Sequence, residues 1–169
     1  MSVTVQATVE RMVMEWASPR KAIHHGRETR FLLACSSEQG PAAGDTGAAI
    51  PVELAEFWRC FTEARLFVDT SFGQWGLKLH KPEEARRLTS RFRTQRTRDH
   101  VEGDLVLGEF LGDSELLLVR CDPNAADYGR VVVALPMDPR GDWYDAAGDL
   151  GVFLEKYERA QGAKFWEEA

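Results

Sequence analysis

Four histidines are the side chains of this chain best suited to moving a proton near neutral pH. His24 and His25 are adjacent in a polar stretch, whereas His80 and His100 are isolated. None has a second ligand three or four residues away on a predicted helix, the spacing typical of a metal site. For an enzyme, we would expect His80 or His100 to lie within hydrogen-bond distance of a carboxylate in a pocket. The histidines therefore predict no catalytic residue, no metal site and no cofactor.

Gly112-Asp113-Ser114 resembles the nucleophile block of the G-D-S esterases. That chemistry needs a histidine to accept the serine proton, and the sequence holds none after His100. The tripeptide is therefore predicted to be a hairpin turn. The nucleophile motif G-x-S-x-G and the glycine-rich nucleotide motifs are also absent from the sequence.

A run of aspartates, Asp138, Asp142, Asp145 and Asp149, is spaced by four, three and four residues. Calcium-binding loops need ligands at positions 1, 3 and 5 with a glycine at position 6, and this run lacks that spacing. We expect solvated loop residues, with Asp149 as the N-cap of a helix.

Length and composition indicate one folded domain. The chain has 169 residues, of which 44% are hydrophobic and 28% charged. No apolar run approaches the roughly 20 residues of a membrane span, and the charged residues in Met1–Trp16 argue against a signal peptide. Three scattered cysteines, Cys35, Cys60 and Cys121, favour reduced thiols. We therefore expect a cytoplasmic protein with no membrane segment.

Charge is unevenly distributed along the chain. Lys78–Arg98 holds eight basic and two acidic residues, whereas Asp99–Asp149 holds three basic and twelve acidic residues. The acidic block disfavours nucleic acid as a partner and suits a basic protein. The alternative interpretation is that acidic loops only keep the protein in solution.

Hydrophobic periodicity predicts four helices. Apolar residues recur at helical spacing, and Pro51 and Pro82 are suited to first helical positions. The predicted helices are Ala7–Ala17, Pro51–Ala64, Pro82–Gln95 and Asp149–Gly162. In the third, Ala85, Leu88 and Phe92 are expected to be buried, and Arg86, Arg87, Arg91 and Arg93 to be exposed.

The remaining apolar segments are separated by turn signals and predict strands. The expected strands are Leu66–Val68, Trp75–Leu79, Asp104–Leu111, Glu115–Arg120 and Arg130–Leu135, with a short edge strand at Trp143-Tyr144. Thr29–Ala34 fits a strand or a helix, and Ser36–Ala49 is predicted to be a surface loop. This order predicts a single α+β domain with a curved, mostly antiparallel sheet packed with helices. Residues 50–169 form its core, and residues 1–49 add a helix and a polar loop to the same domain.

The five tryptophans divide into two groups. Trp16 and Trp58 lie on apolar helix stripes and are predicted core residues. Trp75, Trp143 and Trp166 lie beside turns or near the chain end, where an indole either caps the core or anchors a partner.

The order of elements from Ile50 to Trp166 resembles the SUKH superfamily, which includes the fungal Smi/Knr regulators and many bacterial immunity proteins. The resemblance rests on the helix Ile50–Trp58, the strands around Trp75-Gly76, the segment Asp104–Asp113 and the terminal helix to Trp166. It implies an α+β fold without catalysis. It also implies binding to a cognate toxin, often a nuclease or deaminase, in the cytoplasm of the producing cell.

Our leading hypothesis is therefore a non-catalytic immunity protein that neutralises a basic toxin by occluding it. Acidic and aromatic residues of the acidic block are the predicted partner-binding site: Glu102, Asp104, Asp113, Glu115, Asp142, Trp143, Tyr144 and Asp145. The alternative is a regulatory or scaffolding module of the Smi/Knr type. An enzyme whose arrangement the motifs do not reveal is a third possibility.

Overall fold

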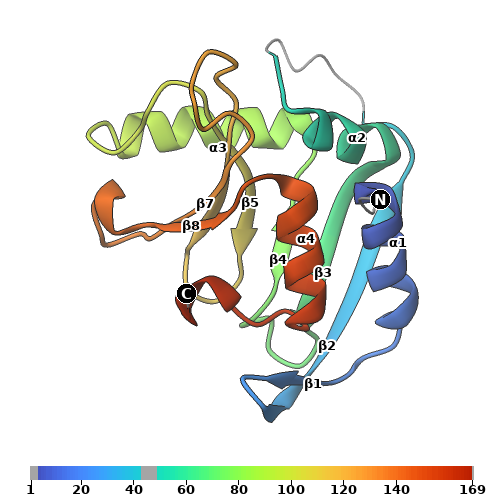
Figure 1. Ribbon diagram of the computed structural model, residues 1–169. Helices are drawn as coiled ribbons and strands as arrows, with labels where there is room; N and C mark the ends of the chain where they lie inside the picture. Colours follow the sequence, from blue (N-terminus) through green and yellow to red (C-terminus); the bar gives the residue numbers. More distant parts are fainter. Residues whose placement is uncertain (1–3, 43–48, 169) are drawn as a thin grey trace.

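The computed structural model describes residues 4–42 and 49–168. An eight-stranded antiparallel sheet runs through the molecule, and each strand pairs with its neighbours in sequence, in the order β1 to β8 (Figure 1). The strands are β1 (Arg20–His24), β2 (Arg27–Gln39), β3 (Phe61–Asp69), β4 (Leu77–Leu79), β5 (Asp104–Phe110), β6 (Leu116–Arg120), β7 (Val131–Ala134) and β8 (Tyr144–Ala147). The α+β fold predicted from the sequence is confirmed.

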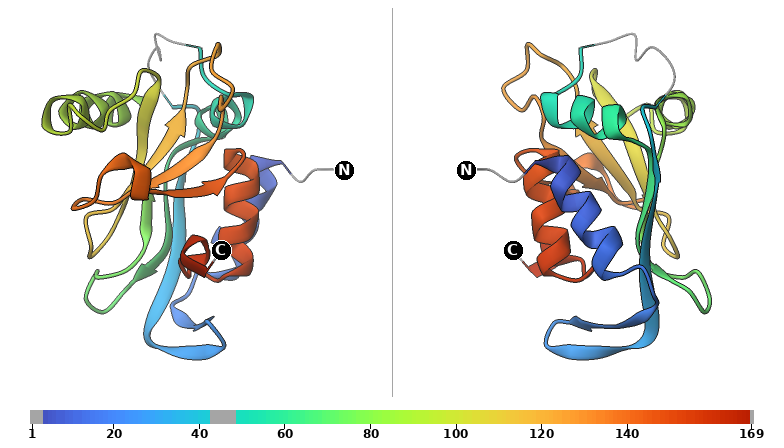
Figure 2. Two further views of the ribbon diagram at one scale, coloured as in Figure 1. Left: turned by 60° about the vertical axis from the view of Figure 1, so that its left-hand side comes forward. Right: turned by 90° about the vertical axis from the view of Figure 1, so that its right-hand side faces the viewer.

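Helices cover both faces of this sheet. The α-helices are α1 (Val5–Glu15), α2 (Val52–Cys60), α3 (Pro82–Gln95) and α4 (Leu150–Arg159), with short 3-10 helices η1 (Arg140–Asp142) and η2 (Phe165–Glu168). Helices α1, α2 and α4 pack against one another on one face, and α3 lies on the opposite face (Figure 2). The sheet therefore separates α3 from the three-helix layer.

Side-chain caps explain where α1 and α4 begin, and an apolar stripe explains which face of α3 is buried. Thr4 Oγ1 accepts a hydrogen bond from the Ala7 N–H at the start of α1, and Asp149 Oδ1 accepts one from Val152 at the start of α4. The predicted N-cap role of Asp149 is confirmed. In α3, the predicted core residues are buried and the four predicted arginines are exposed.

The second helix is shorter than predicted. Helix α2 ends at Cys60, and Phe61–Ala64 belongs to β3. Phe61 fits the helical stripe of Phe57 and Trp58, but in β3 it pairs with Gln39 of β2, and the same side chain is still buried. Tertiary pairing therefore overrides the local helical pattern.

The first 40 residues contribute more to the sheet than predicted. Thr29–Ala34 lies in β2, and the polar His24-His25 stretch forms the tight turn of the β1–β2 hairpin. Ser36–Gln39, predicted as loop, extends β2 along β3; its polar side chains are mostly exposed there. Of the rest of the predicted loop, residues 43–48 lie outside the described part of the chain.

The larger core lies between the sheet and the three-helix layer. Its largest buried side chains include Trp16, Phe57, Phe67, Phe153 and Tyr157. A smaller cluster on the other face packs Leu88 and Phe92 of α3 against the sheet and Trp143. Trp16 and Trp58 are core residues, as predicted. Trp143 and Trp166 are also buried, and Trp75 is half-buried.

The C-terminal segment closes against the first hairpin. Gln161 Oε1 accepts a hydrogen bond from the backbone N–H of Ile23 in the edge strand β1, and its carbonyl lies 2.8 Å from His24 Nε2. Gly162 has a φ of +86°, and a β-carbon there would lie 2.4 Å from Cβ of Phe67. The tight turn after α4 therefore requires glycine.

No helix in the described ranges is long and apolar enough to span a membrane.

We expect Gly162→Ala to lower the free energy of unfolding by about 3 kcal/mol or more, because the left-handed backbone and the clash with Phe67 both add cost. Gly26→Ala is the matched control: its φ is +79°, but nothing lies within 4 Å of the added carbon, so about 1–2 kcal/mol is expected. Urea unfolding measures both. Equal losses would show that the contact with Phe67 is unimportant.

Candidate functional site

Asp104, a predicted partner-binding residue, lies inside the molecule with a fully buried side chain. Its Oδ1 accepts hydrogen bonds from Arg120 at 2.8 Å and Arg140 at 3.0 Å, and its Oδ2 accepts from Arg140 at 2.6 Å and from the Val101 N–H at 2.9 Å. Burial by itself would raise the pKa of Asp104, but the hydrogen bonds and charges of the two arginines lower it below its ordinary value. All four contacts are internal, so this carboxylate has a structural role.

The two arginines extend this cluster into the loops on either side of β7. Arg120 also donates a hydrogen bond to the Asp127 carboxylate. Arg140 donates its backbone N–H to Asp99 Oδ1 and its guanidinium Nη1–H to the Asp99 carbonyl. Trp143 is buried beside Phe92, with the guanidinium of Arg140 5.2 Å from the centre of its ring. We call the ion pairs and hydrogen bonds that join Asp99, Arg120, Asp127 and Arg140 around Asp104 the Asp104 network.

Asp113 and Glu115, which follow β5, both bind the ammonium group of Lys164. Both carboxylates contact Lys164 Nζ, at 3.0 Å for Glu115 Oε1. Burial raises the pKa of Glu115. For Lys164, burial by itself would lower the pKa. Its hydrogen bonds to both carboxylates, and their negative charges, outweigh burial and raise the lysine pKa above its ordinary value. These residues hold the segment before η2 against the β5–β6 turn.

The eight predicted residues do not form one surface. Glu102 and Asp142 are exposed, Tyr144 is half-buried in β8, and Asp145 pairs with Arg130 at 2.5 Å. Asp104 and Asp113 lie at opposite ends of the strand β5, roughly 20 Å apart at about 3.3 Å per residue. Four of the eight, namely Asp104, Asp113, Glu115 and Trp143, make mainly internal contacts. Much of the acidic block is therefore neutralised within the molecule.

His80 and Glu109 form a histidine–carboxylate pair, the arrangement that an acid–base role requires. Their Nε2 and Oε2 atoms lie 2.8 Å apart. The imidazole is buried with 4% of its side chain exposed, whereas Glu109 is 41% exposed. Glu109 lines a groove beside α3, but His80 does not. His100 packs beside Phe92. The pair therefore joins the residue after β4 to β5, with the imidazole buried and the carboxylate at the surface.

A groove of about 530 Å³ opens between α1, α2 and α4. Its charged side chains come from all three helices and from the residue before α4: Arg11, Glu53, Glu56, Asp149, Glu155, Glu158 and Arg159. Five carboxylates thus face two guanidiniums. Val52, which is 74% exposed, and Val152 add apolar surface to its rim. We call this site the acidic groove.

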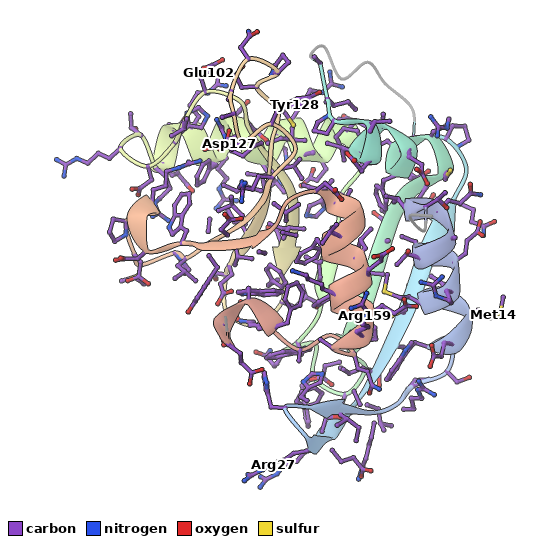
Figure 3. The ribbon with its side chains drawn as sticks, in the orientation of Figure 1. Met14, Arg27, Glu102, Asp127, Tyr128 and Arg159 are labelled. Atoms are coloured by element: carbon purple, nitrogen blue, oxygen red, sulfur yellow. The ribbon has the colours of Figure 1, made fainter. Side chains whose placement is uncertain are left out.

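Part of the acidic groove is held in place by hydrogen bonds. Arg11 donates two hydrogen bonds to Glu158, at 2.9 and 2.7 Å, and these raise the pKa of the guanidinium. Glu56 accepts the backbone N–H of Gln6, the second residue of α1. Arg159 lies at the surface of α4, on the side of the molecule facing the viewer in Figure 3. With Arg11 bound to Glu158, the groove presents excess negative charge to a partner.

Sequence reasoning missed this groove. Apart from Asp149, its carboxylates lie outside the acidic block, in helices whose net charges are small. The signal that could have found it is the polar face of each helix, but only the packing of α1, α2 and α4 brings these faces together.

No protein-family model matches the chain, and a search of curated proteins finds no significant match. Among the described residues, no group of three or more histidine, cysteine or acidic side chains is placed to hold a metal ion.

Replacing Asp104 by alanine should lower the free energy of unfolding by about 3–5 kcal/mol, because two largely buried guanidiniums lose their shared carboxylate. Asp145→Ala is the control, since it removes an exposed ion pair and should cost about 0–1 kcal/mol. Urea unfolding measures both. Similar losses for the two variants would contradict a structural role for the Asp104 network.

The contribution of Asp104 should depend on pH with a defined sign. Because its pKa is lower in the folded protein than its ordinary value of 3.8, its stabilising effect is complete above that value and is lost as the pH falls through the folded pKa. The stability difference between the wild type and Asp104→Asn should therefore be constant near neutral pH and shrink in acid. Unfolding curves at several pH values test this. A difference that widens in acid would contradict it.

Proposed function

We propose that this protein is a binding domain whose acidic groove receives a basic surface of another protein. The observation that carries the proposal is the groove itself: five carboxylates and two arginines, gathered from three helices around exposed valine side chains. Negative charge speeds the encounter with a basic partner, and apolar contacts at the rim strengthen the complex.

The positions of the other acidic residues support this choice of surface. Asp104, Asp113 and Glu115 already have cationic partners, so a ligand would have to displace Arg120, Arg140 or Lys164 to reach them. Carboxylates of Glu53 and Glu155 line the groove without an ion pair within 4 Å among the described residues. These two are available to a partner.

In its specific form, the proposal is that the domain is an immunity protein. Its resemblance to the SUKH superfamily motivates this role, and the groove supplies a surface suited to a basic, nucleic-acid-targeting toxin. The mechanism is occlusion: carboxylates take positions that substrate phosphates would occupy, and the bulk of the domain blocks access. A standard interface of roughly 1,600 Å² in total would suffice.

The opposite face favours one alternative, a scaffolding module of the Smi/Knr type. The exposed arginines of α3 lie across the sheet from the acidic groove (Figure 2). Two surfaces of opposite charge could hold two different partners at once.

We expect the double variant Glu53→Lys/Glu155→Lys to weaken binding to the toxin-like product of the adjacent gene by about tenfold or more. Two charge reversals at the interface each cost on the order of 1 kcal/mol, and tenfold corresponds to about 1.4 kcal/mol. Titration calorimetry measures affinity, and survival on co-expression measures protection. Binding by the wild type should also weaken as salt rises.

Glu102→Lys/Asp142→Lys is the matched control, because it makes the same charge change at exposed residues of the acidic block. This control should bind and protect like the wild type. If the control loses binding and the groove variant keeps it, the interface lies on the acidic block and the groove assignment is wrong. Absence of any complex with the wild type would contradict the immunity role.

A further inference from the structure

A second cleft, of about 610 Å³, lies at the rim of the sheet between α3 and the turns that flank β5 and β6. Its apolar lining includes Trp58, Pro82 and Leu105. This volume falls within the roughly 300–1,000 Å³ of sites that bind small organic ligands, and it exceeds what a single ion would fill. The cleft is separate from the acidic groove, with which it shares no lining residue.

The two walls of this cleft carry opposite charges. Helix α3 contributes Arg86 and Arg93, and the turns contribute Glu102 and Asp122. Within the described part of the chain, none of these four side chains forms an ion pair within 4 Å. Asp104 also lines the cleft, but its charge is already compensated by two arginines. The walls thus leave positive and negative charge available on opposite sides of an apolar floor.

The backbone of both walls is fixed by the fold. Arg86 and Arg93 are seven residues apart on one helix, roughly 10 Å at 1.5 Å per residue, with Ser90 on the same side between them. On the other wall, a β-carbon on Gly103 would lie 2.7 Å from Cβ of Asp122, so the two turns are in close contact. The Asp122 carboxylate also accepts the backbone N–H of Asn124 at 3.0 Å.

Glu102 marks the outer end of this site. In Figure 3 it lies beyond α3 at the end of the molecule where the loops gather, near Asp127 and Tyr128. Arg120, which binds Asp127, also donates to the carbonyl of Glu102 at 2.9 Å. The Asp104 network therefore holds the acidic wall as well as the start of β5.

We propose that this cleft binds a short peptide segment that carries one acidic and one basic side chain around an apolar residue. The acidic side chain contacts Arg86 and Arg93, the basic side chain contacts Glu102 and Asp122, and the apolar residue lies over the floor. A ligand with only one sign of charge would meet repulsion from one wall. This site goes beyond the proposed function, because it uses different residues and its test needs no basic protein partner.

The probe is the blocked tripeptide acetyl-Glu-Leu-Lys-amide, with acetyl-Glu-Leu-Glu-amide and acetyl-Lys-Leu-Lys-amide as matched probes. Titrations followed by amide chemical shifts measure affinity and location. We expect the mixed-charge peptide to bind about two- to fivefold more tightly than either matched probe, because an exposed ion pair contributes about 0.2–1 kcal/mol. The largest shifts should fall at Ser90, Gly103 and Asn124.

Arg93→Ala should weaken binding of the mixed-charge peptide by about two- to fivefold. It should leave the affinity for the Lys-Leu-Lys probe unchanged or raise it. Arg91→Ala is the control, because this exposed arginine of the same helix lines a different groove and should have no effect. Equal affinity for the three probes, no binding of the mixed-charge probe, shifts confined to other surfaces, or an equal effect of the two variants would each overturn the proposal. None of these results bears on the acidic groove.

Discussion

The buried carboxylate of Asp104 is the constraint on which the upper part of this molecule depends. One side chain with no exposed surface must satisfy two guanidiniums, and those guanidiniums in turn hold the turn before β5, the loop after β6 and the loop before β8. A buried charge is tolerated only when its partners are fixed, so these separate loops take up one arrangement. Acidic residues used in this way stabilise the fold and are not available to a partner.

The sheet then divides the remaining surface into regions of different character. Carboxylates from three helices gather on one side, and the arginines of α3 lie on the other. Since α3 is connected to the sheet mainly through Ala85, Leu88 and Phe92, its polar side chains stay in solvent. The net charge of −6 is therefore unevenly distributed, with an acidic face on one side of the sheet and a basic face on the other.

The sequence predicts an element correctly where its local pattern decides the structure, and fails where pairing with a distant segment decides it. Helix α3 follows from its stripe and its proline, and it has the predicted bounds. The exchange of helix for strand at Phe61 was not predictable, because the ring is buried in either case and only pairing with β2 distinguishes a strand from a helix there. The proposed binding surface was harder still to predict. Acidic residues close in sequence turned out to be paired internally, whereas those of the acidic groove come together from positions about a hundred residues apart.

The packing of α1 against α4 has a consequence for how the chain is made. Neighbouring strands pair in sequence order, so most of the sheet can assemble as the chain leaves the ribosome. Helix α1 is different, because its partner Glu158 lies 147 residues beyond Arg11, and the first hairpin meets Gln161 only slightly later. Helix α1 can pack on β2 and α2 early, but the part of its surface that α4 covers stays exposed until residues 150–161 have been made.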